Sequence, residues 1–210
     1  GSGAINIASG AQLYFDRGAT FANPINVSGK GFVESGGFGG GAIRLANSGT
    51  IVSGKVTLLS DARITGRGAG AGGGTISGQI TGNFGIEFGN GGTTLGTLNL
   101  TNTTNNWTGD TTISPGVVRI GSTGEVIPNG AGFGNVIMFG DSAQPSVLDL
   151  NGKTETINGL SSTGLPSQIF INSGIAGPAT LRVGDNNASS DFGGTIQDGN
   201  TVAVVNLTKI

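Results

Sequence analysis

Short triplets in which two apolar residues flank a third recur along the second half of this chain. In a β-strand the outer residues of such a triplet point to one face and the middle residue points to the other. The outer residues are Leu, Ile or Val, which suit a dry interior, so we expect the middle residues Asn99, Arg119, Asp149 and Arg182 to face water, with Phe170 as the exception. The triplets are Leu98-Asn99-Leu100, Val118-Arg119-Ile120, Leu148-Asp149-Leu150, Ile169-Phe170-Ile171 and Leu181-Arg182-Val183.

A tetrapeptide in the first half returns at a nearly constant step. Val27-Ser28-Gly29-Lys30 is followed by Val52-Ser53-Gly54-Lys55 and then by Ile76-Ser77-Gly78-Gln79, at steps of 52 − 27 = 25 and 76 − 52 = 24 residues. A step of this size is typical of a chain that winds once per repeat, so that each coil buries the next. We therefore expect positions 27, 52 and 76 to lie in one column of stacked coils.

The same alignment places Arg63 and Glu87 at equivalent positions of successive coils, since 87 − 63 = 24. Stacked strands lie about 4.8 Å apart, so we expect these two side chains to form an ion pair between coils. A pair of this kind contributes only about 0.2–1 kcal/mol when it is exposed to solvent.

Composition favours an all-β chain. Glycine supplies 43 of 210 residues, but no Gly-X-Y period is present, which excludes collagen. Hydrophobic residues reach 35% and the net charge is only −2, which argues against disorder. Short β-branched runs alternate with Gly, Asn, Ser and Asp turns, and no helical period is sustained. We predict one β-helix segment over residues 1–210, a parallel solenoid of about nine turns with roughly 20–25 residues per turn.

An antiparallel sandwich is the alternative fold, because Asn-Gly and Asp-Gly pairs favour hairpins. Against it, the flanking runs are short, and the recurrence joins segments roughly 20–25 residues apart rather than neighbours. In a coil each strand pairs in parallel with its equivalent one turn later. The hairpin-favouring pairs are Asn90-Gly91, Asn129-Gly130, Asn151-Gly152, Asn158-Gly159 and Asp198-Gly199.

Residue usage also narrows the chemistry. The chain has no cysteine and no histidine, which excludes disulfides and thiolate metal sites and removes the usual general base. Its ten basic residues are scattered, so nucleic acid is not an expected partner. No apolar run reaches about 18 residues, so no membrane-spanning helix is expected.

The text from residue 96 onward is distinctive. Gly96-Thr97-Leu98-Asn99-Leu100-Thr101 precedes Asn105-Asn106-Trp107-Thr108-Gly109-Asp110-Thr111-Thr112-Ile113 and then Pro115-Gly116-Val117-Val118-Arg119-Ile120-Gly121. This order resembles the autotransporter-associated β-strand (PATR-type) repeat of bacterial surface passengers, with Trp107 in the aromatic place. Asn102 and Val118 depart from the usual Gly and Leu. The resemblance covers residues 93–210 well and residues 1–92 more loosely.

The resemblance implies a right-handed parallel β-helix at the bacterial outer surface or in the extracellular space, with no enzyme activity. We therefore expect a non-catalytic structural rod with no cofactor. The start of the chain also resembles the sequence expected to follow Ile210 in such a repeat; it reads Gly1-Ser2-Gly3-Ala4-Ile5-Asn6-Ile7. We expect a fragment or repeat unit of a longer surface protein whose partners are copies of itself or neighbouring repeats, joined end to end in one chain or by stacking.

Three motifs suggest ligand chemistry but have simpler explanations. Gly68-x-Gly70-x-x-Gly73 matches a dinucleotide pattern, yet no helix is expected after it. Gly152-Lys153-Thr154 resembles the end of a P-loop without its first glycine. Asp185, Asn187 and Asp191, with Ser189, alternate as in a calcium loop, but the twelfth position is Ile196 where a bidentate Glu belongs. A turn in which these side chains bond to their own backbone is the alternative.

Surface binding and catalysis remain alternative functions. Asp61, with Arg63 and Glu87, is the best candidate for a polysaccharide lyase or hydrolase, although a structural ion ladder explains it more simply. Trp107 and Tyr14 are candidates for stacking on surface glycans, or else packing residues. We assign no catalytic, cofactor or metal residue. Six Asn-x-Ser/Thr sequons carry little weight in so Asn-rich a chain, at Asn26, Asn99, Asn102, Asn106, Asn187 and Asn206.

Overall fold

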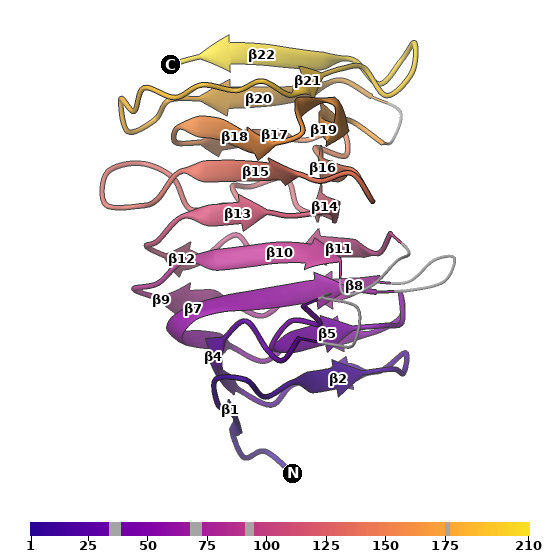
Figure 1. Cartoon of the computed structure of the whole chain (residues 1–210), viewed down its shortest axis with the longest axis vertical. Coiled ribbons are helices and arrows are strands. Elements are labelled where there is room, and N and C mark those ends of the chain that lie inside the picture. Colours follow the sequence, from indigo (N-terminus) through magenta and orange to yellow (C-terminus); the bar gives the residue numbers. More distant parts are fainter. Residues whose placement is uncertain (34–38, 68–72, 91–94, 175–176) are drawn as a thin grey trace.

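The computed structural model is a stack of short strands along one long axis, with the two chain ends at opposite ends of the stack (Figure 1). It describes residues 1–33, 39–67, 73–90, 95–174 and 177–210. Within these ranges the chain forms strands, turns and one short 3-10 helix at Pro166–Gln168. The prediction of an all-β chain is confirmed.

The first sheet contains eleven of the described strands. Seven of them form its continuous path: β1 (Ile5–Ile7), β4 (Ile25–Gly29), β7 (Val56–Gly66), β10 (Ile86–Asn90), β13 (Thr111–Ile113), β15 (Val136–Gly140) and β18 (Leu160–Gly164). The other four pair beside this path: β2 (Leu13–Phe15), β5 (Ile43–Leu45), β9 (Ile80–Gly82) and β12 (Asn106–Trp107).

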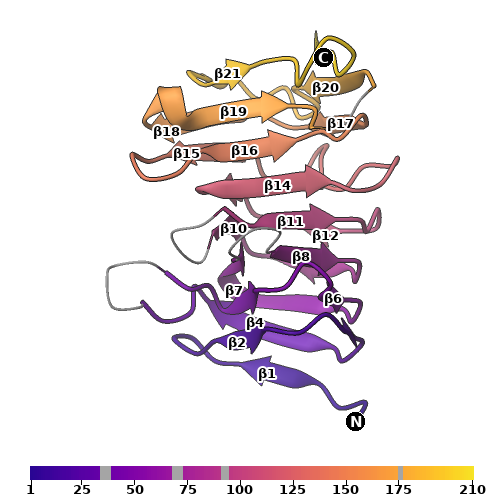
Figure 2. The same cartoon turned by 90° about the vertical axis from the view of Figure 1, so that its right-hand side faces the viewer.

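The second and third sheets complete the wall of the stack, and Figure 2 shows the second sheet face on. The second sheet has the order β3 (Thr20–Phe21), β6 (Ile51–Val52), β8 (Gly73–Ile76), β11 (Thr97–Leu100), β14 (Gly116–Ile120), β16 (Ser146–Asp149), β19 (Ile169–Asn172) and β21 (Thr195–Ile196). The third sheet begins later in the chain, with β17 (Thr154–Ile157), β20 (Ala179–Val183) and β22 (Val205–Lys209).

Every pairing between two named strands in the described residues is parallel. Each strand lies against one found a whole coil later: Val56 pairs with Ile80 and Thr111 with Val136, at steps of 80 − 56 = 24 and 136 − 111 = 25 residues. Hairpins would have joined neighbouring strands in antiparallel fashion. The sandwich alternative is therefore wrong, and long parallel sheets of this kind are compatible with a β-helix.

The predicted column of positions 27, 52 and 76 is only half correct. Val52 pairs with Ile76 in the second sheet, but Val27 pairs with Leu58 in the first sheet. The coil between β4 and β7 is longer than the 24- and 25-residue coils above, because Ile25 pairs with Val56, 31 residues on (56 − 25 = 31), and the register shifts after Val27. A buried Val followed by Ser-Gly can form the turn that follows a strand of the first sheet or of the second sheet. Similar sequences therefore occur at two different places in the coil.

Apolar residues at alternate strand positions fill the interior, and together they form one core cluster. The outer residues of the first four predicted triplets are buried, whereas Arg182 is exposed and Asn99, Arg119 and Phe170 are partly exposed. The prediction that Asp149 faces water is wrong, because this carboxylate is buried.

Hydrogen bonds make the burial of Asp149 possible. Arg119, in register with it one coil earlier, places Nε 2.7 Å from its Oδ2. Its Oδ1 accepts from the backbone N–H of Asn151 at 2.9 Å and of Gly174 at 2.7 Å. A carboxylate with this many donors can leave water at little cost, so Asp149 holds three successive coils together.

Candidate functional site

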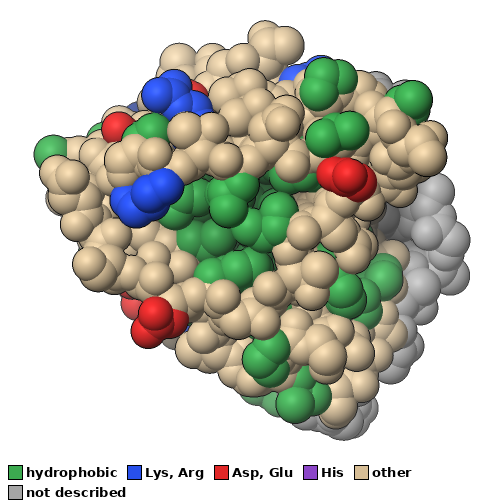
Figure 3. All heavy atoms as spheres, turned by 90° about the horizontal axis from the view of Figure 1, so that it is seen from above, with side chains coloured by type: hydrophobic (Ala, Val, Ile, Leu, Met, Phe, Trp, Pro, Cys, Tyr) green, Lys and Arg blue, Asp and Glu red, His purple; other side chains and the backbone are tan. Residues whose placement is uncertain are grey.

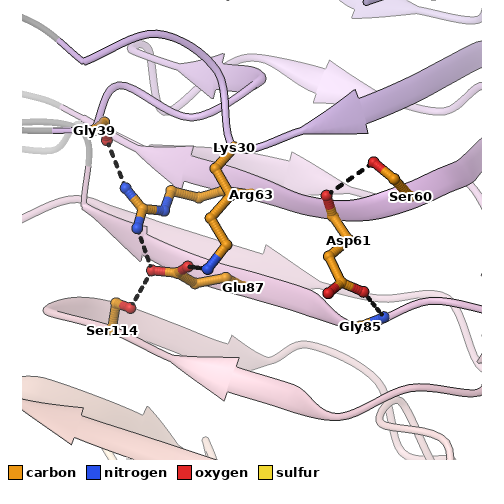
Figure 4. Close-up of polar contacts among 8 residues, drawn as sticks. All are labelled: Lys30, Gly39, Ser60, Asp61, Arg63, Gly85, Glu87 and Ser114. Carbon is orange, nitrogen blue, oxygen red and sulfur yellow. Dashed lines mark hydrogen bonds and ion pairs between the residues drawn. The ribbon is translucent and has the colours of Figure 1, made fainter. Parts of the chain in front are cut away.

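A polar cluster around Glu87 lies on the outer face of the first sheet (Figure 4). Arg63 of β7 and Glu87 of β10 are in register, and Arg63 Nη2 lies 2.8 Å from Glu87 Oε1. Lys30 Nζ lies 3.0 Å from Oε2 of the same carboxylate, and the Ser114 hydroxyl donates to Oε1. The predicted ion pair is confirmed, although Glu87 is buried rather than exposed.

The environment of Glu87 keeps it ionised. Burial opposes its negative charge, but the Ser114 hydrogen bond, the Arg63 charge and the hydrogen bonds from Lys30 and Arg63 outweigh burial and hold the pKa of Glu87 below its usual value. A general acid needs a pKa near the working pH. With a lowered pKa and both oxygens occupied, Glu87 is suited to joining coils rather than to proton transfer.

Asp61, which the sequence suggested as a candidate catalytic acid, is one of a row of side chains that accept hydrogen bonds from backbone N–H groups of the next coil. Its Oδ1 accepts from the backbone N–H of Gly85 at 2.8 Å. One coil beyond Gly85, Asp110 Oδ1 accepts from Asn135 N–H at 2.8 Å, and Asn135 Oδ1 in turn accepts from Gly159 N–H at 2.9 Å. Asp61 lies within β7, whereas Asp110 and Asn135 immediately precede β13 and β15. Each of the three side chains satisfies a backbone donor of the following coil.

The C-terminal end of the stack exposes apolar side chains. Figure 3 shows hydrophobic groups gathered in a depression at the centre of this end, with polar groups around them. The depression has a volume of 640 Å³, and its large apolar lining residues are Leu160, Val183, Phe192, Ile196 and Leu207. Among the described residues, β21 pairs only with β19 and β22 only with β20, so each keeps one free edge.

The N-terminal end presents the matching elements. In the described part of the chain β1, β2 and β3 each pair on one edge only, with β4, β5 and β6 respectively. Ile5, Leu13 and Phe21 are partly buried hydrophobic residues that pack against the core from these strands. Both ends therefore offer free parallel edges beside apolar side chains.

The aromatic candidates have different environments. Trp107 is buried, donates Nε1–H to Thr111 Oγ1 at 3.0 Å and meets the Phe88 ring edge-on at a centroid distance of 6.0 Å. Trp107 is therefore a packing residue and not a platform for a sugar. Tyr14 is exposed, but the Arg44 guanidinium lies over its ring, 5.4 Å from the centroid.

The dinucleotide-like and calcium-like motifs do not form a ligand site in the described residues. Gly68 and Gly70 lie outside the described residues, and Gly73 begins a strand, β8. Around Asp185 the turn is closed by Asn186, whose Oδ1 accepts from Ala188 N–H at 3.1 Å, and Asn187 has a left-handed φ of 58°. Within the described ranges, no three acidic, His or Cys side chains lie together as metal ligands would.

Besides Asp149 and Glu87, the chain buries a third carboxylate that the sequence analysis did not single out, Glu155 of β17, which is fully buried. Its Oε1 accepts from the backbone N–H of Val126 at 3.0 Å and of Ile127 at 2.6 Å, which ties the long loop before β15 to the third sheet. Burial is the largest influence and raises the pKa of Glu155 to about 8, against the lowering effect of these two bonds. The one available signal was a Glu in the short strand text Thr154-Glu155-Thr156-Ile157.

Comparisons with known proteins gave no match to any family model, curated protein or solved structure. In the described part of the chain, no helix has the length and apolar character needed to cross a membrane.

Proposed function

We propose that this chain is a structural segment of a bacterial extracellular rod, similar to an autotransporter passenger and without catalytic activity. Its coil is right-handed, with about nine turns that span roughly 40–45 Å at the spacing of stacked strands. The parallel pairing of all described strands supports this proposal, as does the repeat-like text of residues 96–121. The Glu87 cluster also supports it, because its charges are used to join four successive coils.

The observation that carries the proposal is the C-terminal end, with its apolar depression and two free strand edges. An uncovered edge of this kind favours pairing with another strand. The N-terminal end of a second unit fits it, because β1, β2 and β3 offer free edges that run in the same sense. Such a contact is head to tail and does not close on itself, so it extends the rod whether the units are separate chains or tandem repeats.

Sedimentation velocity tests this association. We expect the average mass of the wild-type chain to rise with concentration, and negative-stain images to show particles lengthened along one axis. Leu207→Asp places a charge in the C-terminal depression, where Leu207 is 56% exposed, and should leave the chain monomeric. Leu59→Asp is the matched control, since Leu59 is 54% exposed in β7, away from both ends.

Two results would contradict the proposal. One is a wild-type chain that remains a single monomeric species at all concentrations reached. The other is an equal loss of association in Leu207→Asp and Leu59→Asp, which would indicate contact through the sides of the stack.

A further inference from the structure

A groove of 370 Å³ runs across several coils beside the Glu87 cluster. Lys30, Asp61 and Glu87 line one part of it, and Figure 4 shows these three side chains near one another on the same face. Phe84 and Asp110 line the adjoining part. The groove lies on the side of the stack, away from the apolar depression at the C-terminal end, so it is independent of end-to-end association.

Two aspartate side chains in the groove each have one carboxylate oxygen fixed by a hydrogen bond, while the other oxygen has none in the described part of the chain. Asp61 and Asp110 each accept one backbone hydrogen bond through Oδ1, from Gly85 and Asn135 respectively. No hydrogen bond from the described residues reaches Oδ2 of either aspartate, and both residues are exposed. A backbone contact that fixes one oxygen pre-orients the other as an acceptor.

An exposed aromatic ring lies between these acceptors along the chain. Phe84 belongs to the turn before β10 and is 38% exposed. Gly85 and Gly109, which also line the groove, carry no side chain that would cover the ring. An apolar surface with a few fixed polar groups around it is the usual composition of a small-molecule site.

The charges of the groove select among ligand classes. Both oxygens of Glu87 are occupied by Lys30, Arg63 and Ser114, so its charge is compensated within the cluster. The free oxygens of Asp61 and Asp110 repel polyanions such as nucleic acids and polyuronates. They accept hydrogen bonds well from hydroxyl groups, and charge-assisted bonds of this kind are strong.

We infer that this groove binds a neutral oligosaccharide. Sugar hydroxyls donate to Asp61 and Asp110 and accept from the Lys30 ammonium, while the apolar face of one sugar ring packs on Phe84. Stacked coils repeat about every 4.8 Å, which is close to the length of one sugar residue. Successive sugars can therefore meet equivalent positions of successive coils.

Isothermal titration calorimetry with cellohexaose, mannohexaose and chitohexaose tests the inference, with hexagalacturonate as the charged comparison. At least one neutral hexasaccharide should bind with a dissociation constant of roughly 1 mM or lower. Phe84→Ala should weaken that binding about tenfold. Phe139→Ala is the matched control, because Phe139 in β15 is 40% exposed and does not line the groove, and it should leave the constant within about twofold.

Asp110→Asn provides a second variant that keeps an oxygen acceptor for Asn135 N–H and removes the charge. It should also weaken binding while the thermal unfolding curve stays near that of the wild type. The inference is overturned if none of the three neutral sugars binds, if only hexagalacturonate binds, or if Phe84→Ala and Phe139→Ala have equal effects.

Discussion

Replacing Gly78 with alanine is expected to lower the free energy of unfolding by about 3 kcal/mol or more. A Cβ atom at Gly78 would lie 1.9 Å from the carbonyl oxygen of Gly54 and 2.6 Å from its carbonyl carbon. These are backbone atoms of the coil below, so they cannot turn aside as a flexible side chain does. The two coils would have to separate and lose packing on both sides. Urea unfolding of the wild type and the variant measures the difference.

Gly193→Ala is the control for this prediction. The nearest heavy atoms to a Cβ at Gly193 are 3.6 Å away, which is ordinary van der Waals contact, so a change within about 0.5 kcal/mol is expected. Equal losses for the two variants would mean that Gly78 does not mark a tight contact between coils. The same contact explains the Ser-Gly recurrence, because a Cβ at Gly54 would lie 2.0 Å from the carbonyl oxygen of Asn23.

The stability of the protein is expected to fall as the pH rises through the neutral range, because of Glu155. Burial raises the pKa of this carboxyl group to about 8 in the folded chain, and the nearby Glu125 charge adds to the effect, whereas the unfolded value is 4.5. Folding therefore favours the protonated form. The stabilisation is complete below pH 4.5 and is lost as the pH rises toward 8, by on the order of 4 kcal/mol between about pH 5 and pH 8.

Glu155→Gln should flatten this profile, because the amide oxygen still accepts from Val126 and Ile127 N–H but carries no titrating proton. Urea unfolding at several pH values measures both curves. Asp191→Asn, at an exposed carboxylate, is the control and should keep the wild-type slope. Glu87 acts in the opposite sense, since its lowered pKa contributes stability that is lost in acid. A wild-type profile that is flat from pH 5 to pH 8, or one that Glu155→Gln does not change, would contradict the assignment.

The parallel all-β architecture and part of its register could be predicted from the sequence because they depend on local sequence patterns. Apolar alternation predicted which side chains of the triplets at 98–100 and 118–120 are buried. The 24-residue step placed Arg63 on Glu87 and Val52 on Ile76. These features repeat from coil to coil, so comparing one stretch of text with the next reveals them.

The features that could not be predicted from the sequence depend on coils of unequal length and on contacts between distant turns. The 31-residue step after Ile25 moves Val27 to a different sheet from Val52, which similarity of text does not reveal. Asp149 and Glu155 are buried because backbone N–H groups about one coil away in sequence point at them. The groove at Phe84 arises from turns that only stacking brings together.

Measuring the distance between two spin labels by double electron–electron resonance tests the stacked coil most directly. The chain has no cysteine, so Ile51→Cys and Thr195→Cys introduce two unique labelling sites at exposed positions of β6 and β21. The second sheet separates these strands by six steps, which predicts a narrow distance distribution centred at roughly 30 Å. A distribution centred below about 20 Å, as for strands folded back beside each other in two layers, would contradict the stack.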